Sequence, residues 1–98
     1  MSSSDDEIRD LAGAVVNLAR RALAEYTPIV DSLVVGRSLD VGDIERTLDG
    51  LLDFCFDPEV LRLFRRLCRH YSSIDPAATE AYVVAYHQLW DRDGEQPP

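Results

Sequence analysis

Arginine side chains gather on one side of the stretch 58–71, where they form the main basic cluster of an acidic chain. This arginine stripe consists of Arg62, Arg65, Arg66 and Arg69. Their spacing places all four within about 100° of one face of a helix. Because a guanidinium group donates two parallel hydrogen bonds, the stripe can bind phosphates or an acidic segment of a partner. We favour internal pairing, with Asp49, Asp53 and the acids of 76–91 as partners.

Arg65 and His70 also fit a loose pattern, an arginine followed after four residues by a histidine near the end of a helix. The stretch 65–70 resembles the signature of HEPN ribonuclease domains, which are all-α and often dimeric. The resemblance implies catalytic roles, in which His70 moves the 2′-hydroxyl proton of RNA and Arg65 stabilises the phosphate. The residue after the arginine is Arg66 rather than a small polar one, so this ribonuclease is kept as one alternative function. A phosphate or nucleic-acid contact through the arginine stripe is the other.

The stretch 76–91 predicts a helix that is apolar around most of its circumference. One flank carries an aromatic stripe of Tyr82, Tyr86 and Trp90. These rings can seal the core, line a pocket or meet a second subunit. We favour the core, and a homodimer through this helix is the next interpretation.

The polar strip of the same helix holds Glu80, His87 and Asp91. His87 and Asp91 lie one turn apart, whereas Glu80 is too far along the helix to share one ion with them. The Glu-x-x-His pattern of metal-binding bundles is absent. We therefore expect a solvated His–Asp pair, and neither a metal nor another cofactor.

Apolar spacing and proline positions predict the elements that hold these residues. Apolar residues at intervals of three and four, from Ile8 to Tyr26, predict a helix over 5–26 with one apolar face. Thr27–Pro28 predicts a kink or a restart, followed by a short helix over 28–35 and a loop over 36–42. The next helix has Asp40 or Ser38 as its cap, and its apolar residues extend from Val41 to Cys55.

Asp57–Pro58 and Asp75–Pro76 each place a capping aspartate before a proline at the first helical position. They predict helices over 58–71 and 76–91. We therefore expect an all-α protein, a small antiparallel bundle of four main helices, with a fifth short helix if Pro28 splits the first. A single domain would cover 5–92, between disordered ends at 1–4 and 93–98. Cys55 and Cys68 fall on apolar faces and are expected to be core residues without a disulfide.

The chain has 98 residues and a formal net charge of -8, with arginine as its only basic residue type apart from two histidines. Such a charge repels nucleic acids and anionic membranes. Signal-peptide features and long apolar runs are absent, so we expect a cytoplasmic protein without a membrane span. Phosphate-binding loops, nucleophile elbows and zinc patterns are also missing. The sequence therefore favours a small acidic, non-enzymatic interaction module, such as an inhibitor, immunity protein, antitoxin or accessory subunit. It would bind another protein through the arginine and aromatic stripes.

Overall fold

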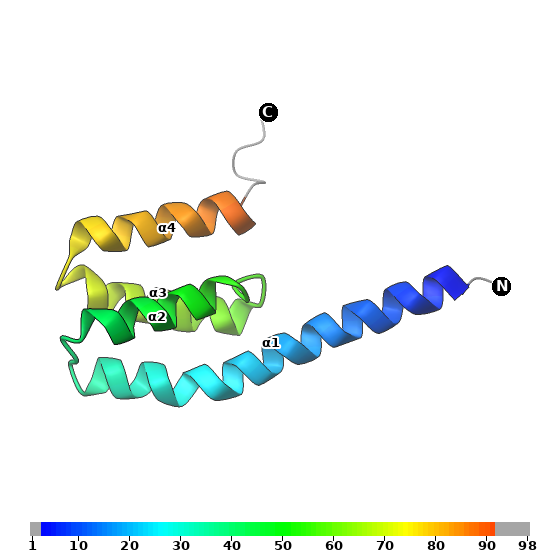
Figure 1. The fold of residues 1–98 in the computed structure, drawn as a ribbon, viewed down its shortest axis with the longest axis horizontal. Helices are drawn as coiled ribbons and strands as arrows, with labels where there is room; N and C mark the ends of the chain where they lie inside the picture. Colours follow the sequence, from blue (N-terminus) through cyan, green and yellow to red (C-terminus); the bar gives the residue numbers. More distant parts are fainter. Residues whose placement is uncertain (1–2, 92–98) are drawn as a thin grey trace.

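The computed structural model describes residues 3–91 and contains four helices in that range: α1 (Ser3–Val35), α2 (Val41–Leu52), α3 (Pro58–Ser72) and α4 (Pro76–Trp90). Consecutive helices run in opposite directions, and α3 packs against each of the other three (Figure 1). The predicted all-α antiparallel bundle is thereby confirmed. The ends predicted to be disordered, 1–4 and 93–98, lie outside the described residues except for 3 and 4, which belong to α1.

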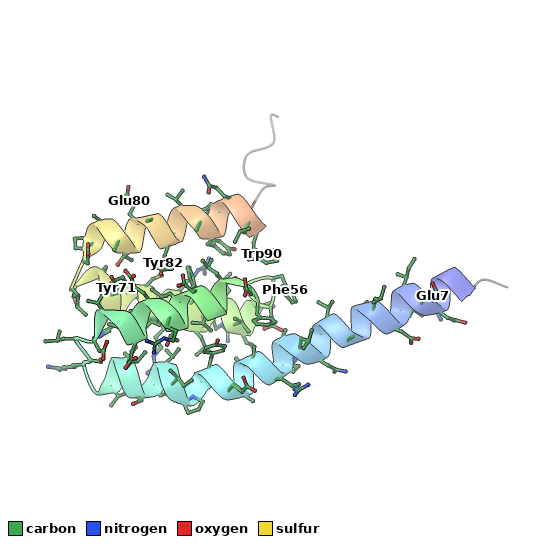
Figure 2. All side chains as sticks on the ribbon, in the orientation of Figure 1. Glu7, Phe56, Tyr71, Glu80, Tyr82 and Trp90 are labelled. Atoms are coloured by element: carbon green, nitrogen blue, oxygen red, sulfur yellow. The ribbon has the colours of Figure 1, made fainter. Side chains whose placement is uncertain are left out.

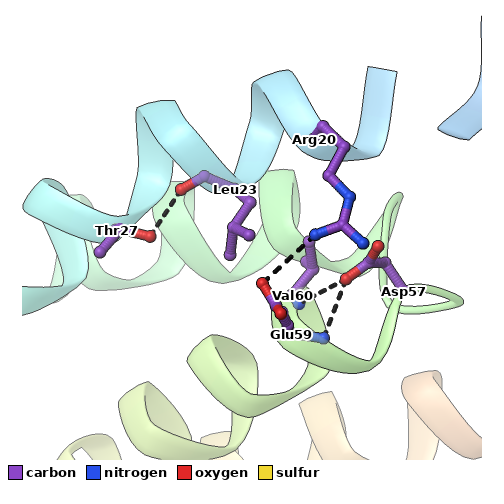
Figure 3. Close-up of polar contacts among 6 residues, drawn as sticks. All are labelled: Arg20, Leu23, Thr27, Asp57, Glu59 and Val60. Carbon is purple, nitrogen blue, oxygen red and sulfur yellow. Dashed lines mark hydrogen bonds and ion pairs between the residues drawn. The ribbon is translucent and has the colours of Figure 1, made fainter. Parts of the chain in front are cut away.

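Aspartate caps start the three shorter helices, as predicted. At the start of α3, Asp57 accepts the backbone N–H groups of Glu59 and Val60 at 2.9 and 3.2 Å (Figure 3). Asp75 caps α4, and a proline follows the cap in both helices. For α2 the cap is Asp40, the first of the two predicted residues. A cap uses only local hydrogen bonds, which is why the sequence predicts these starts to the residue.

Pro28 lies inside α1, which continues through it to Val35. Of the two predicted alternatives, a kink or a split, the split is therefore wrong, and the helix changes direction in the cyan part of Figure 1. Proline removes one backbone hydrogen bond. In the preceding turn, the hydroxyl group of Thr27 donates to the carbonyl of Leu23 at 2.6 Å, an arrangement that favours bending (Figure 3). Ala22 and Val30 are buried on either side of the proline, so packing against the bundle holds the helix together across it.

The loop predicted over 36–42 is shorter in the structure, because α2 begins at Val41. Arg37, rather than the glycine before it, adopts the left-handed conformation, with φ 52°. Immediately after it, the backbone N–H group of Ser38 donates to the carbonyl of Leu33 at 2.9 Å and closes the end of α1. An arginine therefore occupies the position that glycine adopts at lower cost.

The core lies between the inward faces of α1, α2 and α3, and α4 covers it with partly buried side chains. Buried apolar residues of α3 form its centre: Val60, Leu63, Phe64, Leu67 and Tyr71. Cys55 and Cys68 belong to this core as free thiols, as predicted. Cys55 follows the end of α2 at Leu52, so the helix expected to reach it ends earlier.

The N-terminal half of α1 projects beyond the end of the bundle (Figure 1). We call residues 6–18 the arm, since every one of them is exposed. The exposed fraction is 62% for Ile8, 67% for Leu11, 46% for Val15 and 50% for Leu18. The apolar face predicted over 5–26 is therefore covered only from Ala19 onward.

Helix lengths explain the uncovered arm. With 33 residues α1 spans about 50 Å, whereas the 15 residues of α3 span about 23 Å. At the boundary, Arg20 of α1 pairs with Glu59 in the first turn of α3 at 3.4 Å (Figure 3). Although α1 is long, no helix within residues 3–91 combines the length and the hydropathy that a membrane span requires.

Candidate functional site

The four residues of the arginine stripe have different neighbours. Arg66 is half-buried and forms an ion pair with Asp31 of α1. The other three are exposed and form no ion pair with any side chain that the structure describes: Arg62, Arg65 and Arg69. Internal pairing therefore applies to one member of the stripe. Its partner is an acid of α1 instead of the predicted acids of α2 and α4.

Arg65 and Arg69 line a groove between α3 and α4, with a volume of about 380 Å³. We call it the α3–α4 groove. Its remaining lining is mainly apolar and comes from both helices: Leu61, Phe64, Cys68, Ser72, Thr79, Val83, Tyr86 and His87. Two unpaired guanidinium groups thus lie beside an apolar surface that is open to solvent. This is the place in the described chain where the predicted binding residues of α3 and α4 come together.

The aromatic stripe packs mainly against the chain's own bundle, as Figure 2 shows for Tyr82 and Trp90. The hydroxyl group of Tyr82 donates to the backbone carbonyl of Glu45 at 3.4 Å. The indole N–H of Trp90 donates to the carbonyl of Leu52 at 2.7 Å. The ring of Tyr86 lies 6.0 Å from that of Phe64 and also lines the α3–α4 groove. Tyr82 and Tyr86 pack against the core, which is the role that we favoured from the sequence, whereas Trp90 is 40% exposed.

Glu45 of α2 accepts a hydrogen bond from the hydroxyl group of the fully buried Tyr71. This hydrogen bond, followed by burial, raises the pKa of Tyr71 to about 12. Burial is the main cause that raises the pKa of Tyr82, whose hydroxyl group also contacts Glu45. The sequence did not indicate Glu45, since its position in α2 resembles that of any surface acid. Its contacts join α2 to both α3 and α4.

Arg65 and His70 lie on different sides of α3, separated by about 140° around the helix axis. Arg65 lines the α3–α4 groove, whereas Nε2 of His70 lies 2.8 Å from the backbone carbonyl of Ser38 in the α1–α2 loop. Because a carbonyl oxygen only accepts, Nε2 carries the hydrogen in this contact. The structure therefore does not bring the two residues of the ribonuclease pattern together within one chain.

His87 and Asp91 form the predicted pair at the end of α4, with 2.7 Å between Nδ1 and Oδ2. Both side chains are about half exposed, so the pair is solvated, as expected. Glu80 points away from the bundle in Figure 2. No group of three metal-binding side chains occurs among the residues that the structure describes.

Both thiols are protected from solvent. Sγ of Cys55 donates to the carbonyl of Leu51 at 3.3 Å, and burial is the main cause that raises its pKa to about 12. Burial also raises the pKa of Cys68 to about 11. Such thiols are protonated at neutral pH and are therefore weak nucleophiles.

Three of the predicted binding residues thus line the α3–α4 groove: Arg65, Arg69 and Tyr86. His87 lines it as well and is bound to Asp91. In comparisons with known proteins, no family model, curated protein or solved structure matches this chain.

Proposed function

We propose that this chain is a small non-enzymatic interaction module that binds another protein through the α3–α4 groove. One observation carries the proposal: Arg65 and Arg69 are exposed beside apolar side chains and form no ion pair within residues 3–91. Arginine together with an apolar centre is a composition enriched in protein interfaces.

The groove suits a partner segment that combines apolar side chains with carboxylates. Each guanidinium group can donate two hydrogen bonds to one carboxylate, while Val83 and Tyr86 offer apolar surface beside them. The net charge of -8 disfavours a partner that is acidic overall. We therefore infer that the acidic groups are local to the docked segment, within a protein of neutral or basic surface. An inhibitor, antitoxin or immunity protein fits this role, as does an accessory subunit.

The absence of enzymatic activity belongs to the same proposal. Its support is that both thiols are buried and that His70 is bound to the backbone of Ser38. We also propose a cytoplasmic location, where buried free cysteines persist as thiols.

The test is affinity capture from the source cell, followed by titration of the identified partner. We expect Arg65→Glu combined with Arg69→Glu to weaken binding at least tenfold, because both guanidinium groups are replaced by repelling carboxylates. Arg62→Glu is the matched control, since Arg62 is exposed on the same helix but does not line the groove. Equal weakening by the control, or no weakening by the double variant, would contradict the groove.

The ribonuclease alternative has its own readout. Incubation of the protein with RNA should give no cleavage. Cleavage that is lost on Arg65→Ala combined with His70→Ala would replace the interaction module with the enzyme.

A homodimer through α4 also stays a prediction. Two apolar side chains of this helix are exposed, Val84 at 46% and Leu89 at 51%. Aspartate substitutions at these two residues test it, and they serve as a control in the experiment below.

A further inference from the structure

The arm carries an apolar seam that no described part of the chain covers. Its four residues are spaced by three and four along about 15 Å of helix: Ile8, Leu11, Val15 and Leu18. The same helical face continues into the bundle, where Ala19 and Ala22 are buried. A face that is buried at one end and exposed at the other indicates that a further element packs on the exposed end.

We propose that this seam binds the same seam of a second copy of the chain in antiparallel orientation. The two arms would then form a two-helix contact, with one bundle at each end. The contact is isologous: the same apolar residues of both copies meet across a two-fold axis. The seam is distinct from the α3–α4 groove, and the inference does not depend on the proposed function.

The charged residues beside the seam favour a second copy of the chain as its partner, and they favour the antiparallel orientation. Glu7 and Arg21 are exposed and lie fourteen residues apart, two heptads along the helix, so they occupy the same edge of the seam. In an antiparallel pair centred on Gly13, Ile8 lies opposite Leu18 of the partner. Glu7 of each copy then lies beside Arg21 of the other. The arm is therefore complementary to itself when reversed.

A parallel pair lacks this complementarity. With the copies aligned in parallel, Glu7 would lie beside Ala12 of the second copy and Arg21 beside Tyr26, neither of which carries an opposite charge. The two bundles would also meet at the same end, where the face that includes Ala22 is already buried by the chain's own bundle.

The end of the bundle beside the arm offers further apolar surface to the partner. The rings of Phe56 and Trp90 lie 5.5 Å apart at that end and are 41% and 40% exposed (Figure 2).

The first experiment measures the mass of the full chain by size exclusion with light scattering. The wild-type chain should have twice the monomer mass, and Leu11→Asp combined with Val15→Asp should have the monomer mass. Both residues are exposed in one copy, so the bundle should stay folded and most of the helical circular dichroism signal should remain. The matched control is Val84→Asp combined with Leu89→Asp on α4, which should remain dimeric.

The second experiment tests orientation by charge reversal. Glu7→Arg and Arg21→Glu should each weaken self-association at least tenfold, since like charges then meet twice in the antiparallel pair. An equimolar mixture of the two single variants should form a heterodimer, because each arm then meets its opposite.

Two results would overturn the proposal. A wild-type chain that is monomeric at every concentration tested would show that the seam does not bind a second copy. A dimer that survives the arm substitutions but is lost on the α4 substitutions places the contact on α4. Arg65→Glu combined with Arg69→Glu should leave the mass unchanged, which separates this test from that of the groove.

Discussion

At the scale of single residues, the contacts that hold the helices together join side chains far apart in the chain. Arg66 pairs with Asp31, and Tyr71 donates to Glu45. The sequence predicted that Arg66 lies in a basic stripe. It could not predict the acid partners, because each lies on another helix and its position depends on how the helices pack.

Removing the hydroxyl group of Tyr71 should destabilise the protein. We expect Tyr71→Phe to lower the free energy of unfolding by about 1–3 kcal/mol, because a buried hydrogen bond to a carboxylate is lost. Urea unfolding monitored by circular dichroism measures this change. Glu45→Gln keeps an acceptor for the hydroxyl group and should cost less. A Tyr71→Phe variant as stable as the wild type would show that the bond contributes nothing.

Stability should fall in alkaline solution. The folded state raises the pKa of Cys55 and Tyr71 to about 12 and that of Cys68 to about 11, above the ordinary pKa values of 9.0 for cysteine and 10.0 for tyrosine. The unfolded chain therefore loses these protons at a lower pH than the folded chain. The stability that these groups contribute is fully present below the ordinary cysteine pKa of 9.0 and is lost progressively up to pH 12. The chain has no lysine, so cysteine and tyrosine are the side chains that titrate in this window.

Urea unfolding at a series of pH values from neutral upward would measure this decline. The double variant Cys55→Ala, Cys68→Ala should be less stable than the wild type at neutral pH. It should lose less stability than the wild type in the first pH unit above the ordinary cysteine pKa of 9.0. A free energy of unfolding that stays constant across the whole window would contradict the raised pKa values.

At the scale of the elements, local signals predicted helix starts well and helix ends less well. Asp57 and Asp75 cap their helices as expected, since caps and N-terminal prolines act within one turn. Pro28 was expected to allow a break, but the bundle buries residues on both sides of it and the helix continues. Tertiary packing therefore outweighed a local preference there.

The end of α1 offers a stabilising substitution. Arg37 has φ 52°, a conformation that costs an L-residue about 1–2 kcal/mol and costs glycine little. We expect Arg37→Gly to raise the free energy of unfolding by about 0.5–1 kcal/mol, after the entropy that glycine adds to the unfolded chain. Thermal unfolding measures the change. Leu39→Gly, also in the exposed loop but without positive φ, should lower stability, and an equal effect of both would reject this explanation.

Gly50 of α2 permits the close approach of α1. A Cβ at this position would overlap the hydroxyl oxygen of Tyr26 and lie 2.6 Å from its Cζ. Alanine within a helix normally adds up to about 1 kcal/mol relative to glycine. Here we expect Gly50→Ala to lower stability by about 1–3 kcal/mol, because the ring must move.

Thermal unfolding of Gly50→Ala decides the sign of the change. Adding Tyr26→Leu to Gly50→Ala should recover part of the loss, because the shorter side chain relieves the overlap. A more stable single variant would show that the ring moves at no cost.

At the scale of the whole molecule, the structure departs most from a compact bundle at the arm. The radius of gyration is 15.8 Å, whereas a compact chain of this length has about 13 Å. Apolar spacing from Ile8 to Tyr26 predicted the helix and its apolar face. It could not predict what covers that face, because spacing reports amphipathic character and not the identity of the neighbour. The α3–α4 groove was partly foreseen, since the sequence named its arginines and Tyr86 but not the geometry that joins them.

Hydrogen exchange should divide the molecule into two regions. In the monomeric variant with Leu11→Asp and Val15→Asp, the amides of the arm should exchange much faster than those of α3, since the arm lacks tertiary contacts. In the wild-type chain, protection of the arm should increase with protein concentration. Equal protection of the arm and α3 in the monomeric variant would contradict an isolated arm.

The short connections between consecutive helices have a kinetic consequence. Each joins antiparallel neighbours across a few residues, so the chain needs no long loop closure before its first helix pairs form. Bundles of this kind fold on a timescale of about microseconds to milliseconds. The pairing of two arms is bimolecular, and its rate depends on how often copies meet. Refolding should therefore show a fast phase that is independent of concentration, followed by a slower second-order phase in which the arms and the adjoining end of the bundle change their surroundings.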